Sequence, residues 1–251
     1  MKKLEQLVAS QLSEIDKDFK SKKYLLAVSG GSDSICLMHV YDNLNLNFEI
    51  AHCNFQLRGA ESDGDEQFVK SLSKSLGTKG NYIQFNTKEI SKSNKTSIQE
   101  EARALRYNWF KDLARAKSFD YIVTAHHQDD LIETFFINSV RGSGIRGLRS
   151  IPLVTENIMR PLLKVSKETI KKYITDSEII YRDDSSNENL KYSRNYLRHK
   201  IIPELEHVHQ NAKKEITNTI CNLIETEKYL QSKLAEDFKN FVKEIEGGVE
   251  V

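Results

Sequence analysis

Cysteine, proline and long apolar runs are scarce in this chain, which has three cysteines and three prolines among 251 residues. Cys36, Cys53 and Cys221 are far apart, which excludes a C-x-x-C cluster pair and a disulfide framework. We interpret them as ordinary cytosolic thiols. No run of about 18 apolar residues occurs, so we expect no membrane span. The N-terminal segment is too charged for a secretory signal, and we expect a cytoplasmic protein that binds no membrane.

A strong net charge is also lacking, because the formal net charge is +1 although 29% of the residues are charged. The overall balance therefore indicates no partner. Residues 141–200, however, contain more Lys and Arg than Asp and Glu. Such a local excess attracts phosphate backbones, but it also occurs on ordinary solvated surfaces. Both interpretations stay open on charge alone.

Hydrophobic periodicity predicts strands that alternate with helices. Apolar runs predict strands over residues 24–28, 48–53, 81–85 and 120–125. Helical spacing predicts helices over residues 33–44, 61–76, 96–116 and 129–140, and Ser97 to Glu100 fits a capping box at the start of the third. This alternation is typical of stacked βαβ units. We therefore expect an α/β fold, a Rossmann-like parallel sheet with helices on both faces, followed by a helical extension.

The two ends of the chain are predicted to be helical. An amphipathic N-terminal helix has on one face Leu4, Leu7, Val8, Leu12 and Ile15. Shorter helices are expected over 167–175 and 192–202, and a long one over 215–245 that ends at Gly247-Gly248. We expect a catalytic domain over 1–210 and a long helix with linker character over 211–251.

A glycine-rich loop, Ser29-Gly-Gly-Ser-Asp-Ser34, follows the first strand and opens a helix. Glycines let the backbone approach a phosphate, and the N–H groups of the first helical turn face the anion. Asp33 can bind Mg²⁺, which prefers carboxylate and phosphate oxygens. No Lys-Ser/Thr follows the glycines, which excludes a Walker A loop. The alternative is a plain strand-to-helix turn capped by serine.

Other polar segments also follow predicted strands, at 52–59 and 126–130. Ligands bind at the carboxyl ends of the strands in such sheets, so these segments are expected to meet at one edge. Read alone, His126 and His127 beside Asp129 and Asp130 could form a metal cluster or a helix start. Arg103 and Arg106 share a helix face that could simply be solvated.

The Ser29–Ser34 loop resembles the S-G-G-x-D-S PP-loop of the N-type ATP pyrophosphatases, which have an adenine nucleotide alpha hydrolase-like fold. That family cleaves ATP between its α and β phosphates and adenylates an oxygen of the substrate. The resemblance implies ATP and Mg²⁺ as cofactors. The ATP-binding residues that it implies are Ser29, Gly30, Gly31, Ser32, Asp33, Ser34, His52 and Asn54.

Further segments resemble the tRNA(Ile)-lysidine synthetases within this family. The matching segments, in the same order, are 51–63, 101–107, 124–134, 141–144, 160–162, 181–187 and 192–199. Phe55 departs from the pattern, because many members have His there. The resemblance implies a ligase that adenylates C2 of the wobble cytidine in tRNA(Ile) with a CAU anticodon. L-lysine then replaces the adenylate, which yields lysidine, AMP and pyrophosphate.

The resemblance also implies roles for individual residues. We expect Asp33 and Asp130 to bind Mg²⁺ and Arg103 or Arg106 to stabilise the phosphates. Asp130 and Glu133 are candidates for binding lysine, and His126 or a carboxylate for accepting its proton. The arginines expected to contact tRNA phosphates are Arg58, Arg141, Arg146, Arg149, Arg194 and Arg198.

The resemblance implies further C-terminal domains that bind tRNA, and we expect a region of that kind to be absent after 211–251. Whether a homodimer compensates is left open. Three rival functions stay in view. A tRNA thiolase would use cysteines such as Cys36 and Cys53, although no C-x-x-C pair exists. A small-molecule synthetase such as GMP synthetase would leave the later arginines unexplained. A non-catalytic tRNA-binding protein would not need Asp33, Asp129 and Asp130.

Overall fold

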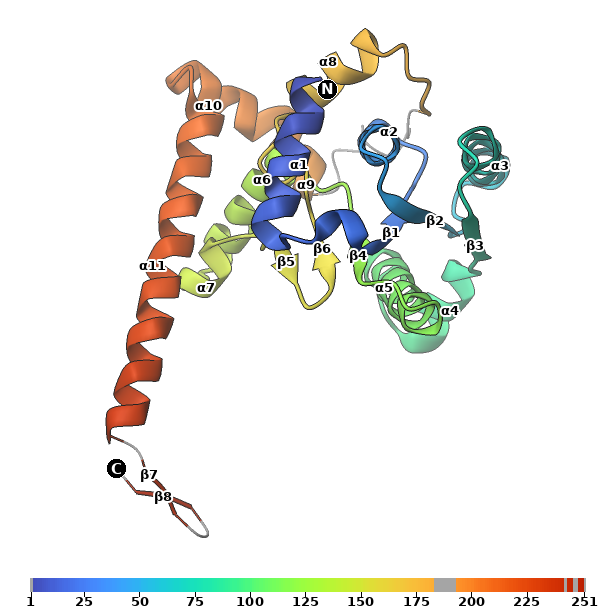
Figure 1. The fold of residues 1–251 in the computed structure, drawn as a ribbon. Coiled ribbons are helices and arrows are strands. Elements are labelled where there is room, and N and C mark those ends of the chain that lie inside the picture. Colours follow the sequence, from blue (N-terminus) through green and yellow to red (C-terminus); the bar gives the residue numbers. More distant parts are fainter. Residues whose placement is uncertain (1, 183–192, 242, 246–247, 251) are drawn as a thin grey trace. The chain divides into compact units, whose positions relative to one another are not determined.

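The computed structural model describes residues 2–182, 193–241, 243–245 and 248–250 (Figure 1). Their contacts divide the chain into two compact units. Unit 1 contains the described residues of Met1–Gln128 and Leu153–Ser186, and unit 2 those of Asp129–Pro152 and Asn187–Val251. These cuts differ from the expected boundary after residue 210, which remains a prediction.

Unit 1 contains a six-stranded sheet in the order β3-β2-β1-β4-β6-β5. Its strands are β1 (Lys23–Ala27), β2 (Asn47–Asn54), β3 (Gly80–Gln84), β4 (Tyr121–Val123), β5 (Val154–Thr155) and β6 (Ile158–Met159). All neighbours are parallel except β5 and β6. The predicted strands and the largely parallel sheet are confirmed. The two-residue strands β5 and β6 were not predicted.

Helices cover both faces of this sheet, as expected (Figure 1). They are α1 (Lys3–Ile15), α2 (Ser32–Asn43), α3 (Ala60–Ser75), α4 (Thr87–Asn94), α5 (Ile98–Ala116) and α8 (Lys167–Asp176), with a 3₁₀ turn at Phe19–Ser21. On one face, Leu26 of β1 packs in a core with Ile35 of α2 and Ile170 of α8. On the other face, Leu25 packs with Phe110 of α5. This alternation along β1 is what two covered faces require.

Local sequence signals explain several of these helices and fail for two details. Ser97 accepts a hydrogen bond from the Glu100 N–H at 3.2 Å, so the predicted capping box begins α5. In α1, Leu4, Val8 and Leu12 are buried, but Leu7 is 41% exposed, which corrects its expected place in the apolar face. The helix α4 was not predicted, because its mostly polar residues show no apolar stripe.

Unit 2 is mostly helical. It contains α6 (Gln128–Val140) from Asp129 onward, α7 (Ile145–Leu148), α9 (Ser193–Tyr196), a π-helical turn (Leu197–Ile201), α10 (Ile202–Val208), α11 (Ala212–Phe241), β7 (Lys243–Ile245) and β8 (Gly248–Glu250).

The long helix was predicted correctly in kind but not in its end. α11 ends at Phe241, and β7 pairs with β8 in an antiparallel hairpin. The expected C-cap is therefore wrong: Gly248 begins β8, and Gly247 lies outside the described residues. Glycine favours chain reversals between strands as well as after helices, so the local pattern did not separate the two. In the described residues, no helix is long and apolar enough to cross a membrane.

Candidate active site

The glycine-rich loop lies at the carboxyl end of β1 and leads into α2. Gly30 has φ +101°, a conformation that residues with a side chain rarely adopt. The N-cap residue of α2 is Gly31, and no side chain caps this helix end with a hydrogen bond. The alternative of a turn capped by serine is therefore not supported. Ser34 Oγ instead accepts from the Ser29 N–H at 3.2 Å and donates to Gly31 O at 3.0 Å. The first-turn N–H groups of α2 remain suited to an anion.

Lys167 and His127 both lie against the carboxylate of Asp33. Lys167 Nζ donates to Asp33 Oδ1 at 2.5 Å and to Ser32 Oγ at 2.9 Å. His127 Nε2 lies 3.5 Å from Asp33 Oδ2. Burial alone would raise the pKa of the Asp33 carboxyl, but the hydrogen bonds and charges of His127 and Lys167 lower it to about 2. Asp33 is therefore ionised, as a metal- or cation-binding carboxylate must be.

Lys167 and His127 are site residues that the sequence analysis missed. Of the two neighbouring histidines, we had chosen His126, whose Nδ1 lies 2.8 Å from Thr124 Oγ1. His127 is the one that is buried beside Asp33. The signal available for it was its place in the polar segment that follows β4. Lys167 had no signal beyond its position at the start of a predicted helix.

His52 and Asn54 are two residues apart on β2 and therefore lie on the same face of the strand, and both are buried. His52 Nδ1 lies 2.8 Å from Val28 O, which requires a proton on Nδ1, because a carbonyl only accepts. Burial lowers the pKa of His52, which favours the neutral ring. Its Nε2 is buried without a hydrogen-bond partner among the described residues and can accept one from a ligand.

Asn54 is engaged within the protein. Its Nδ2 donates to Asp63 Oδ1 and to Glu66 Oε2, both at 2.9 Å, and its Oδ1 accepts from the Gln56 N–H at 2.9 Å. The side chain thus connects the end of β2 to α3. A direct contact of this side chain with ATP stays a prediction.

Arg58 and Arg182 converge on Asp65 of α3. Arg58 Nη2 lies 2.7 Å from Asp65 Oδ2, and Arg182 Nε lies 2.5 Å from Oδ1. The Arg182 N–H also donates to Gly30 O at 3.0 Å, beside the glycine-rich loop. A Cβ on Gly64 would lie 3.2 Å from Arg182 Nη2, so glycine leaves room for this guanidinium. The structure thus pairs Arg58 with Asp65 in unit 1, and its expected contact with tRNA phosphates stays a prediction.

Arg106 is a half-buried residue of α5 rather than a member of a solvated face. Its guanidinium lies 5.1 Å from the centroid of the Phe55 ring, and Phe55 stacks on Phe85 at 5.8 Å. Burial lowers the pKa of Arg106. Arg103 is exposed and lies over the Tyr107 ring at 4.7 Å. The departure at Phe55 therefore provides an aromatic partner for a predicted phosphate-binding arginine.

In unit 2, a second group of candidates surrounds Glu133. This carboxylate is fully buried, and Arg198 Nε donates to its Oε1 at 2.7 Å. Arg198 Nη2 also lies 3.7 Å from Asp130 Oδ1. Burial raises the pKa of Glu133, and the neighbouring Asp130 raises it further, whereas Arg198 opposes both. Glu133 Oε2 has no hydrogen-bond partner among the described residues.

Arg198 lies in the π-helical turn, a distortion often found at functional sites. The structure pairs it with Glu133 and Asp130, and its expected contact with tRNA phosphates stays a prediction. Arg149 is likewise paired, because its Nη1 lies 2.8 Å from Glu227 Oε2 of α11. Contacts of these two arginines with nucleic acid stay predictions.

The remaining arginines are more accessible. Arg141, Arg146 and Arg194 are exposed, and Arg194 Nη2 donates a hydrogen bond to Thr134 Oγ1 at 3.1 Å.

No group of three or more His, Cys, Asp or Glu in the described part of the chain is arranged to bind a metal. The histidine–aspartate cluster is therefore not supported. Asp129 instead lies 3.5 Å from Lys213 Nζ. Asp33 and Asp130 belong to different units, so a joint Mg²⁺ site stays a prediction.

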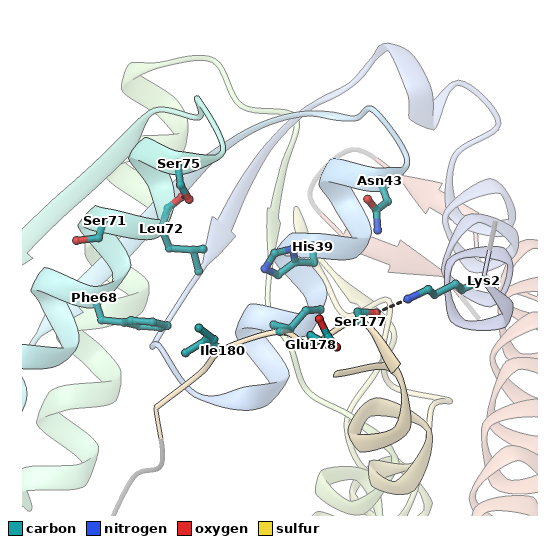
Figure 2. Close-up of a pocket in the computed structure, with 11 residues that line it drawn as sticks. Lys2, His39, Asn43, Phe68, Ser71, Leu72, Ser75, Ser177, Glu178 and Ile180 are labelled. Atoms are coloured by element: carbon teal, nitrogen blue, oxygen red, sulfur yellow. Dashed lines mark hydrogen bonds between the residues drawn. The ribbon is translucent and has the colours of Figure 1, made fainter. Parts of the chain in front are cut away.

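A cavity of about 600 Å³ lies elsewhere in unit 1 (Figure 2). Its walls come from the C-terminal part of α2, with His39 and Asn43, from α3 and from residues 177–180. Lys2 Nζ donates a hydrogen bond to Ser177 Oγ at 2.5 Å, which Figure 2 draws as a dashed line between two lining residues. None of the predicted ATP-binding residues lines this cavity, so it is distinct from the glycine-rich loop.

Comparison with known proteins identifies the family of the chain. The family model described as a PP-loop domain matches residues 4–205. The tRNA(Ile)-lysidine synthase of Porphyromonas gingivalis is 40% identical over 220 residues, which are 87% of this chain and 48% of that protein. The enzyme of the same name from Chlorobaculum tepidum is 43% identical over 186 residues, 72% of this chain and 56% of that protein. This chain thus spans about half the length of these relatives.

The fold has a similar solved structure in the U34-tRNA thiolase NcsA from Methanococcus maripaludis. The TM-score is 0.71 at 19% identity, over 88% of this chain and 78% of that one. At this identity the likeness concerns the fold alone. Because the PP-loop model covers most of the chain and its signature loop has the geometry described above, the chain belongs to the PP-loop domain family.

Proposed function

We propose that this chain carries the catalytic centre of a tRNA(Ile)-lysidine synthetase. It would use ATP to adenylate the wobble cytidine of tRNA(Ile) with a CAU anticodon and then attach L-lysine. The observation that carries the proposal is the pair of acid–cation groups, Asp33 with Lys167 at the PP-loop and Glu133 with Arg198 in unit 2. The first suits a triphosphate, and the second suits a cationic second substrate. The similarity to lysidine synthases over 87% of the chain supports it.

In the first step, the C2 oxygen of the cytidine attacks the α-phosphorus of ATP, and pyrophosphate leaves. The PP-loop and the start of α2 bind the departing phosphates, where negative charge grows. Arg106, or Arg103 on the same helix, neutralises the triphosphate. Magnesium, bound by Asp33 and Asp130, would supply further charge neutralisation. The target base has to leave its stack to reach this edge.

In the second step, the ε-amine of lysine attacks C2, and AMP leaves. Asp130 and Glu133 are one turn apart on α6 and are proposed to position the lysine. The unpartnered Glu133 Oε2 supports this, because a buried carboxylate oxygen gains a hydrogen bond from an incoming ammonium group. His126, or one of the carboxylates, accepts the proton that the amine loses.

The exposed arginines Arg141, Arg146 and Arg194 are proposed to bind the tRNA phosphates. The arginines that have ion pairs within the protein, Arg58, Arg149 and Arg198, are proposed to have smaller roles. We further propose that the protein acts in the cytoplasm, where its tRNA substrate is found. A homodimer would enlarge the surface available to tRNA.

The test is lysine-dependent release of AMP with unmodified tRNA(Ile) of CAU anticodon, with the CAU-containing methionine tRNA as the control. Release of AMP is expected with the isoleucine tRNA but not with the methionine tRNA. Absence of release in a protein that binds ATP would contradict the proposal for this chain. Within the same assay, Arg103→Ala is expected to lose adenylation and keep its fold, and unchanged turnover would remove Arg103 from the mechanism.

A tRNA thiolase is the second candidate, because the thiolase NcsA shares the fold. The cysteines argue against it. Burial raises the pKa of Cys36 to about 12 and of Cys53 to about 12, so neither thiol is readily ionised for sulfur transfer. A thiolated tRNA product after incubation with a sulfur donor would favour the thiolase, and ATP–pyrophosphate exchange separates both enzymes from a non-catalytic tRNA-binding protein.

A further inference from the structure

We propose that Lys167 binds the β and γ phosphates of ATP and so supplies the cation that the PP-loop itself lacks. This inference rests on the proposed function only for the statement that the loop binds ATP. The loop contains no lysine, unlike a Walker A loop, in which lysine reaches these phosphates. Lys167 reaches the loop from α8, 135 residues beyond Ser32.

The position of the ammonium group supports this role. Lys167 Nζ lies 2.9 Å from Ser32 Oγ and 2.5 Å from Asp33 Oδ1, and these are the first two residues of α2. The group therefore lies at the helix N-terminus, where phosphate oxygens bind to backbone N–H groups. The Lys167 side chain is 24% exposed, so a ligand can reach it.

In the protein without nucleotide, the positive charge and the hydrogen-bond donors of Lys167 are only partly satisfied by their neighbours. The positive end of the α2 dipole repels a cation, and Asp33 offsets this repulsion while also facing His127. An ammonium has three N–H donors, and its hydrogen bonds to described residues use two of them. The third donor is suited to a phosphate oxygen, and a triphosphate would add the negative charge that one shared carboxylate does not provide.

Lys167 belongs to a helix, α8, that is held in place by its N-cap and by buried side chains. It is the first residue of α8, whose N-cap Ser166 accepts a hydrogen bond from the Thr169 N–H at 3.2 Å. Further along the helix, Ile170 is fully buried and Tyr173 nearly so. A cation fixed in this way needs little ordering when nucleotide binds, which favours phosphate binding over a loose surface contact.

The experiment is equilibrium binding of ATP, pyrophosphate and AMP to the full chain, without tRNA or lysine. The variants are Lys167→Ala and Lys167→Arg. The control is Lys164→Ala, because Lys164 is three residues earlier, is 54% exposed, and has only a surface ion pair with Glu14 at 3.7 Å. Thermal unfolding of each variant checks that it is folded.

In Lys167→Ala, affinity for ATP and pyrophosphate is expected to fall about 10- to 100-fold, the usual value of a charge-assisted hydrogen bond. Affinity for AMP should change less than about twofold, and Lys167→Arg should recover part of the loss. An equal loss for ATP and AMP, or no loss for ATP, would overturn the proposal. Wild-type protein that binds ATP in this pattern but releases no AMP with tRNA would contradict the proposed function while leaving the role of Lys167 intact.

Discussion

The candidate site residues of each unit include a carboxylate that lies against a basic side chain, Asp33 with Lys167 in unit 1 and Glu133 with Arg198 in unit 2, and the two pairs differ in burial. Asp33 in unit 1 has a side chain that is 29% exposed, whereas Glu133 in unit 2 is fully buried. The pKa of Asp33 is lowered to about 2, while that of Glu133 is raised. In both, burial favours the neutral acid and the cation favours the charged one. At Asp33 the neighbouring basic groups determine the net shift of the pKa, whereas at Glu133 burial determines it.

This difference shows that an ion pair alone does not determine the behaviour of a site. Lysine is a compact, strongly hydrated point charge that suits the solvent-accessible pair. Arginine presents a planar fork and is more weakly hydrated, which suits the pair with the buried carboxylate. We therefore expect that removing the cation from the Glu133–Arg198 pair costs more stability than removing it from the Asp33–Lys167 pair, although both pairs are proposed to serve ligand binding. Four measurements test this contrast.

The largest effect is expected for Arg198→Met, which leaves Glu133 buried without its cation. At pH 8 the free energy of unfolding should fall by about 3–5 kcal/mol. The loss should be smaller at pH 5, because a carboxyl with a raised folded-state pKa binds protons in the folded protein and loses stability as pH rises. Urea unfolding at both pH values measures this. Arg194→Met, at an exposed residue, is the control, and equal losses in both variants would remove the contrast.

The second prediction concerns Asp33→Asn. A carboxyl whose folded pKa is lowered from 3.8 to about 2 stabilises the protein above its unfolded pKa and loses that contribution as pH falls. The stability difference between wild type and variant should therefore change by about 2 kcal/mol between pH 5 and pH 2. Glu14→Gln, which alters an exposed ion pair, should show no such change. A pH-independent difference for Asp33→Asn would contradict the lowered pKa.

The third prediction isolates the backbone of the PP-loop. Gly30→Ala should cost about 1–2 kcal/mol, because φ +101° is unfavourable for a residue with Cβ. Crowding is not the cause, since the new Cβ would lie 3.6 Å from its nearest neighbour, in Val69. Gly144→Ala is a matched control: φ there is −72° and no atom lies within 4 Å. Thermal unfolding of both variants decides between strain at this loop and a general intolerance of substitution.

The smallest stability effect is expected for Lys167→Ala, below about 1 kcal/mol, because a partly exposed ion pair contributes little. The same variant is expected to lose ATP affinity, so its two readouts should diverge. If its unfolding free energy fell as far as that of Arg198→Met, the Asp33–Lys167 pair would be a structural element of unit 1 after all.

Sequence patterns predicted the parts of this molecule that depend on near neighbours. The strand from Tyr24 to Val28, the capping box at Ser97 and the PP-loop motif all express local rules of periodicity, hydrogen bonding and backbone conformation. The end of α11 was wrong because glycine is compatible with two local structures. The strands β5 and β6 are too short for any periodicity to show.

The missed site residues depend on contacts between distant parts of the sequence. Lys167 and Asp33 are 134 residues apart, and Arg198 and Glu133 are 65 apart. Charge and motif indicated that arginines and lysines matter, but only the fold shows which carboxylate each one meets. For that reason the sequence and the resemblance did not reveal that each of Arg58, Arg149 and Arg198 is paired with a carboxylate of its own unit.

The strand order has a consequence for synthesis of the protein. The central strand β1 pairs on one side with β2 and on the other with β4, and the bond from Lys23 N to Asp120 Oδ2 joins residues 97 apart. At ribosomal rates, roughly 5–20 s separate the appearance of these two residues. During that interval one edge of a buried apolar strand has no partner and can pair with other chains. Fragments that end before Tyr121 are therefore expected to aggregate or to require a chaperone.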